Sequence, residues 1–101
     1  MISPPIFLFY KDQMIVTDRT EVQRKSEPDF IRNLEAFDAS GRRLAVKASP
    51  GAIALLEGDP ADLRQELKKR LEAFWRRSGS PLPGIEAMGP EEAVRASIEW
   101  L

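Results

Sequence analysis

The chain has 101 residues and a formal net charge of −1, and it contains neither cysteine nor histidine. The lack of both residue types excludes disulfides, thiolate chemistry, Ser-His and Cys-His nucleophile systems and most zinc sites. A near-neutral charge gives no global basic field that would draw the chain onto nucleic acid or an anionic membrane.

The first quarter of the sequence favours strands. The run IFLFY (residues 6–10) is apolar at every position, which is typical of a buried strand, and MIVT (residues 14–17) predicts a second one. Residues 18–26 leave two alternatives open, a short helix with a capping box or a polar extension of the second strand. The segment EPDF (residues 27–30) is expected to break whichever forms.

A three-stranded antiparallel meander is predicted next. Its strands are expected near residues 33–38, 42–48 and 52–57. They are joined by the turns DASG and SPG, in which glycine takes a positive φ. The middle strand places apolar residues on one face and basic residues on the other: Leu44, Val46 and Ala48 against Arg43 and Lys47. The meander is therefore expected to have one buried face and one solvated face.

The remaining sequence predicts two helices. The first spans residues 60–78, with Asp59 as N-cap and Pro60 in the first turn. It carries an apolar stripe of Leu63, Leu67, Leu71 and Phe74. Because the meander needs one face covered, this helix is expected to lie across the sheet. A final helix over residues 90–101 is predicted to align Val94, Ile98 and Leu101.

Together these elements predict an α+β fold in a single domain, residues 1–101. We expect an antiparallel sheet of about five strands in the order β-β-α-β-β-β-α-α, with the 60–78 helix packed on one face. Residues 5–78 would hold the sheet and main helix, residues 79–89 a Pro/Gly connector, and residues 90–101 the last helix. The sequence has no signal-peptide pattern and no run of about 20 apolar residues, so a cytoplasmic protein without membrane contact is expected.

Two motifs resemble a loose class of small bacterial proteins. The run SEPDFIRNLEAFDASGRRLAV combines a proline break with a D-x-x-G-R-x-L hairpin, and the amphipathic segment GDPADLRQELKKRLEAF follows it. This pattern, over about residues 5–77, is similar to that of immunity proteins encoded beside polymorphic toxins. Asp29 directly follows Pro28, which departs from the E-P-x-D spacing of that class. The resemblance implies a small antidote that binds a toxin.

The sequence offers little for catalysis. Its tightest carboxylate groupings are Glu57 with Asp59 and Glu91 with Glu92, and the preference of acids for helix starts explains most of them. Neither a phosphate-binding glycine pattern nor a divalent-cation spacing is present. The sequence therefore predicts no enzyme, with no catalytic residues, no metal site and no cofactor.

Aromatic and basic residues at the helix ends are the candidate binding residues. Trp75 lies about 85° from the centre of the apolar stripe, and burial in the core is favoured for it over contact with a partner. For Trp100 the two alternatives are equally favoured. For Arg76 and Arg77, a solvated helix flank is favoured over a nucleic-acid site.

The leading hypothesis is a non-enzymatic protein-binding protein, specifically an immunity-type inhibitor that occludes a toxin. Its binding residues would be Trp75, Arg76, Arg77, Trp100 and Glu57. One alternative is a small nucleic-acid-associated regulator that uses Arg42 and Arg43 together with the 75–77 cluster. Another is a structural subunit that forms a homodimer through the final helix. A carboxylate-dependent enzyme is the weakest alternative.

Overall fold

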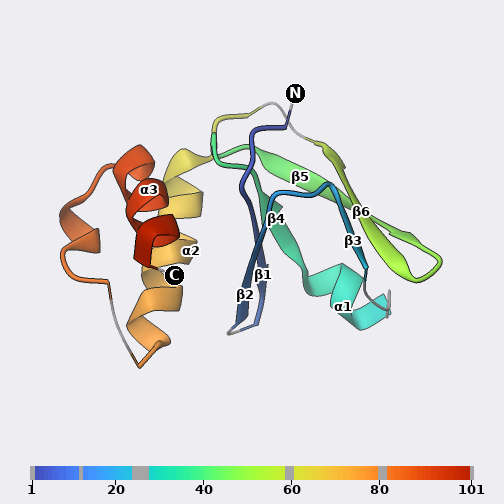
Figure 1. The fold of residues 1–101 in the computed structure, drawn as a ribbon, viewed down its shortest axis with the longest axis horizontal. Coiled ribbons are helices and arrows are strands. Elements are labelled where there is room, and N and C mark those ends of the chain that lie inside the picture. Colours follow the sequence, from blue (N-terminus) through green and yellow to red (C-terminus); the bar gives the residue numbers. More distant parts are fainter. Residues whose placement is uncertain (1, 12, 24–27, 59–60, 80–81, 101) are drawn as a thin grey trace.

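A computed structural model describes residues 2–11, 13–23, 28–58, 61–79 and 82–100. Its strands are β1 (Ile6–Tyr10), β2 (Gln13–Thr17), β3 (Glu21–Gln23), β4 (Glu35–Phe37), β5 (Arg43–Ser49) and β6 (Ala52–Glu57). Its helices are α1 (Pro28–Asn33), α2 (Arg64–Arg77), the short 3₁₀ helix η1 (Ile85–Ala87) and α3 (Pro90–Trp100). The six strands form one antiparallel sheet in the order β2-β1-β4-β5-β6-β3 (Figure 1).

The sheet curls on itself because its two edge strands are consecutive in the sequence. Only residues 18–20 connect β2 at one edge with β3 at the other. Such a link spans at most about 15 Å, so the two edges approach each other at that end. The Leu55 amide also donates a hydrogen bond to the Thr20 carbonyl, 2.7 Å away, which fixes the link against β6.

Alternation along the strands divides the apolar residues between the two faces of the curled sheet. The inner face and α1 together bury Ile6, Leu8, Phe30, Leu34, Ala36, Leu44, Ile53 and Leu55. The outer face of β1 and β4 packs against α2 and α3, and this cluster buries Phe7, Phe9, Phe37, Leu67, Leu71, Trp75, Leu82, Ile85, Ala93 and Val94. Since β1 contributes to both clusters, it is buried on both faces, as its uninterrupted apolar run predicts.

The predicted α+β class is confirmed, but the sheet has six strands instead of about five. Within residues 18–26, the described part contains strand and no helix, but it does not extend β2 as predicted. Glu21–Gln23 form the separate strand β3, which lies at the opposite edge of the sheet from β2. The EPDF segment is more than a break, because Pro28 begins α1. Proline disfavours helix in the residue before it but suits the first helical turn, and the buried ring of Phe30 anchors this helix to the inner cluster.

The predicted helices need shorter bounds. The main helix covers Arg64–Arg77 instead of 60–78, with Leu63 at the N-cap position and no side-chain cap. The predicted cap at Asp59 and Pro60 lies outside the described residues, as does Leu101. The connector is not simply extended, because η1 interrupts it and buries Ile85.

The meander is present, but α2 does not cover the face that the sequence analysis assigns to it. Leu44 and Val46 belong to the inner cluster with α1, whereas α2 packs on the opposite face of β1 and β4. Ala48, expected on the buried side, is exposed. The curl explains this difference, because it turns the apolar face of β5 and β6 inward. The turn glycines Gly41 and Gly51 have φ values of 86° and 70°, as predicted.

Candidate functional site

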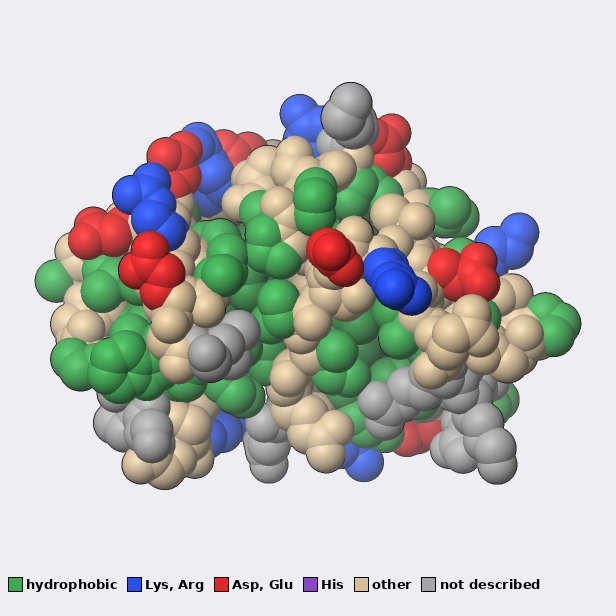
Figure 2. Space-filling view, viewed as in Figure 1, with side chains coloured by type: hydrophobic (Ala, Val, Ile, Leu, Met, Phe, Trp, Pro, Cys, Tyr) green, Lys and Arg blue, Asp and Glu red, His purple; other side chains and the backbone are tan. Residues whose placement is uncertain are grey.

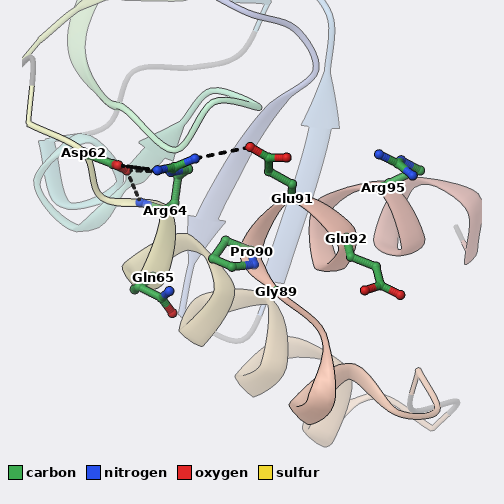
Figure 3. Close-up of a pocket in the computed structure, with 8 residues that line it drawn as sticks. All are labelled: Asp62, Arg64, Gln65, Gly89, Pro90, Glu91, Glu92 and Arg95. Carbon is green, nitrogen blue, oxygen red and sulfur yellow. Dashed lines mark hydrogen bonds and ion pairs between the residues drawn. The ribbon is translucent and has the colours of Figure 1, made fainter.

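A groove of about 530 Å³ lies where α2 and α3 begin (Figure 3). It is lined by Asp62, Arg64, Gln65, Gly89, Pro90, Glu91, Glu92 and Arg95. Arg64 lies on its wall between Asp62 and Glu91 (Figure 3). The Arg64 Nε atom lies 3.0 Å from both oxygens of Asp62, and its Nη1 atom lies 3.2 Å from Glu91 Oε1, so the side chain joins the two helices.

The pairing of Asp62 with Arg64 favours the ionised form of both side chains. Hydrogen bonds from the Arg64 side chain and backbone hold the pKa of Asp62 below its usual value. The Asp62 carboxylate in turn raises the pKa of Arg64. Neither shift moves a group toward neutral pH, where a general acid or base works best. The Asp62–Arg64 pair is therefore better suited to polar docking than to proton transfer.

A second hollow of about 430 Å³ continues from the groove past Arg64 to the turn before β5. That turn is built on the buried carboxylate of Asp38, which accepts bonds from the amides of Ser3, Ser40 and Arg42 at 3.0–3.1 Å and from Ser40 Oγ at 2.6 Å. Burial raises the pKa of Asp38, but these hydrogen bonds outweigh it and hold the pKa below its usual value. The role of Asp38 as a buried anchor is not among the sequence-based predictions, although D-x-x-G is a typical signal for a side chain that bonds its own turn.

In the described ranges, no three acidic side chains lie close enough together to hold a metal ion. Within the same ranges no helix is long and apolar enough to cross a membrane.

The surface of α3 is the second candidate site. Its buried side consists of Ala93, Val94 and Ser97. The large apolar side chains of Ile98 and Trp100 remain 39% and 48% exposed. At 100° per residue they lie about 160° apart around the helix, on opposite borders of its buried side. Of the stripe predicted for this helix, Val94 is buried and Ile98 is exposed, and Leu101 lies outside the described residues.

Charged residues occupy the ridge of α3 between these two apolar borders. Glu91, Glu92, Arg95 and Glu99 are all exposed, which gives three carboxylates against one guanidinium. Figure 2 shows acidic side chains interspersed with basic ones on the helical side of the molecule. We call Glu91, Glu92, Arg95, Ile98, Glu99 and Trp100 the α3 face.

The predicted site residues do not form one surface. Trp75 is only 5% exposed and donates its indole N–H to Ser97 Oγ, so the core alternative for it is confirmed. Arg76 and Arg77 are exposed at the end of α2, and they lack the indole as a neighbouring surface platform. Glu57 is exposed at the end of β6, on the side of the molecule where α2 begins, whereas Arg76 and Arg77 lie at the other end of α2 (Figure 1). Trp100 alone contributes to the α3 face.

Comparisons with known proteins give no family assignment, since no family model, curated protein or solved structure matches the chain.

Proposed function

We propose that this chain is a non-enzymatic binding protein that contacts a partner protein through the α3 face. The exposure of Trp100 and Ile98 on one short helix carries this proposal. Exposed tryptophan is a common energetic anchor of protein interfaces, because its large ring buries much area and loses few rotamers on binding.

The arrangement of the α3 face favours a particular way of docking. The apolar side chains lie on both borders of a charged ridge, so a partner can bury both of them only if its groove surrounds the helix, as in helix-in-groove recognition. The ridge carries more carboxylates than guanidinium groups, so the floor of that groove should be basic. A basic cleft with apolar walls is therefore the partner chemistry that α3 fits.

The narrower form of the proposal is an immunity-type antidote that occludes a toxin. An acidic helix inserted into a basic cleft would block a toxin whose own substrate is anionic. This form draws on the motif resemblance together with the acidic ridge of α3. The nucleic-acid alternative has less support, because the burial of Trp75 removes the aromatic platform that it needs beside Arg76 and Arg77.

Co-expression with each toxic protein encoded in the same gene neighbourhood tests the narrower form. We expect the chain to restore growth against one of them. We expect Ile98→Glu to lose this protection while the control Arg32→Glu, an exposed charge change on α1, keeps it. Restored growth by both variants would remove the α3 face from the function, and protection against none would refute the antidote.

A further inference from the structure

The outer face of β5 and β6 is left uncovered by the helices. Arg43, Ala45 and Lys47 alternate on this face of β5, and the strand register places Leu56 of β6 opposite Ala45 and Ala54 opposite Lys47. In Figure 1, α2 and α3 lie on one side of the molecule and β5 and β6 extend away from them. Leu56 is 47% exposed as a result. We call Arg43, Ala45, Lys47, Ala54 and Leu56 the β5–β6 ledge.

The border of this ledge that lies toward α2 is basic, and a residue of α2 contributes to it. Arg70 of α2 forms a bidentate pair with Glu35, with nitrogen–oxygen distances of 2.9–3.2 Å. Arg43 approaches the same carboxylate at 3.6 Å, and its guanidinium lies over the Phe37 ring. Arg70 therefore borders the ledge at Arg43. Glu35 pairs with both of these cations, Glu66 of α2 also interacts with Arg70, and Glu21 of β3, in register with Ala54, lies at the far border.

Lys47 adds a further positive charge on the ledge. It is exposed, and it makes no hydrogen bond or ion pair with the part of the chain that the structure describes. In the strand register, Arg43 and Lys47 flank Ala45, the residue opposite the exposed Leu56, and Arg70 lies beyond them at Glu35 of β4. An apolar side chain framed by cations favours a partner segment that is apolar on one side and acidic on its flanks.

The shape of the ledge favours a helix as this segment. Ala45 and Ala54 are small, so a helix could approach the sheet beside α2 as α2 itself approaches β1 and β4. The row from Arg43 to Lys47 is about 13 Å long. That length matches between two and three turns of an α-helix.

We propose that the β5–β6 ledge docks an acidic amphipathic helix of a partner protein. Its apolar side would cover Leu56, and its flanking carboxylates would pair with Arg43, Lys47 and Arg70. This site is independent of the α3 face, because the two share no residue and have opposite charge preferences.

Nucleic acid fits the ledge less well than an acidic helix does. An acidic amphipathic helix has an apolar side that can cover the exposed Leu56, whereas a phosphate backbone has none. The ledge also presents small aliphatic side chains instead of the aromatic platforms on which bases stack.

An NMR titration of the isotope-labelled full chain tests this proposal. The probe is an 18-residue acidic peptide with leucine at helical spacings i, i+3, i+4 and i+7 and glutamate on the flanks. We expect chemical-shift changes to concentrate on residues 43–47 and 54–56. We expect Lys47→Glu to weaken binding by roughly tenfold. The matched charge reversal Arg32→Glu, on α1, should leave binding unchanged.

Two parallel titrations distinguish the alternatives. The same peptide with lysine in place of glutamate should not bind the ledge. Absence of shifts at the ledge with the acidic peptide, or shifts confined to the α3 face, would overturn the proposal. So would an 18-nucleotide oligothymidylate that binds the ledge more tightly than the acidic peptide. Absence of binding at the ledge leaves the α3 proposal untouched, since no ledge residue belongs to that face.

Discussion

The indole Nε1 of Trp75 lies 3.0 Å from the hydroxyl oxygen of Ser97, and both residues are buried between α2 and α3. This bond satisfies a polar group that would otherwise be buried without a partner. It also sets the rotation of α3, because turning Ser97 toward α2 leaves Ile98 and Trp100 on the two borders of the contact. The exposure of the α3 face thus depends on a hydrogen bond in the core.

Ser97→Ala should destabilise the fold by about 1–3 kcal/mol, because the indole N–H would be buried without an acceptor. Urea unfolding measures the loss. In a Trp75→Phe background the same substitution should cost much less, since no N–H then needs a partner. Equal losses in the two backgrounds would show that the hydrogen bond contributes nothing.

Asp38 should make the folding free energy depend on acid pH. Its pKa is lower in the folded chain than the value of 3.8 expected when it is unfolded. The stabilisation is therefore complete above the unfolded pKa and is lost as pH falls through the folded pKa. Unfolding midpoints measured from pH 7 to pH 2 should fall more steeply for the natural chain than for Asp38→Asn. Parallel curves would contradict this role.

Gly41→Ala should destabilise the fold more than Gly51→Ala. Both glycines have a positive φ, which costs an L-residue about 1–2 kcal/mol. Only at Gly41 would the new methyl group collide with the backbone and side chain of Arg64, whereas the space around Gly51 is open. Thermal unfolding of the two variants separates the cost of the backbone conformation from that of the contact. The expectation fails if their midpoints fall equally.

Glu35→Gln should affect stability and peptide binding differently. The carboxylate and its two arginine partners are all partly exposed, so their pairing contributes less than about 1 kcal/mol. In this variant the neutral amide would no longer balance the positive charges of Arg43 and Arg70 beside the β5–β6 ledge. Binding of the acidic peptide should therefore become stronger. Weaker binding by this variant would show that Glu35 positions the arginines for the ligand.

Local patterns in the sequence predict local structure well. The apolar run of β1, the turn glycines and the amphipathic α2 follow from alternation, positive φ and helical spacing, which short segments determine by themselves. The helix α1 is missed because a six-residue helix with one large buried anchor, Phe30, leaves little periodic signal.

The long-range arrangement of the strands and helices could not be predicted from local patterns in the sequence. The curl of the sheet depends on the positions of β2 and β3 at opposite edges, and no local pattern in the sequence indicates these positions. For the same reason the inner position of Leu44 and the bare ledge around Leu56 could not be foreseen. The full burial of Trp75 could not be predicted because it depends on α3 covering the ring. The sequence does contain one signal for it, since Ser97 lies within the apolar side of α3 and a buried serine needs a polar partner.

Site-specific photo-crosslinking in the source cell tests the α3 face most directly. A photoreactive phenylalanine derivative replaces Ile98 in one variant and Arg32 of α1 in the control. We expect the residue-98 probe to capture one distinct protein with a basic cleft and the residue-32 probe to capture none of it. Capture of the same proteins from both positions, or of only a second copy of this chain from position 98, would contradict the proposed function.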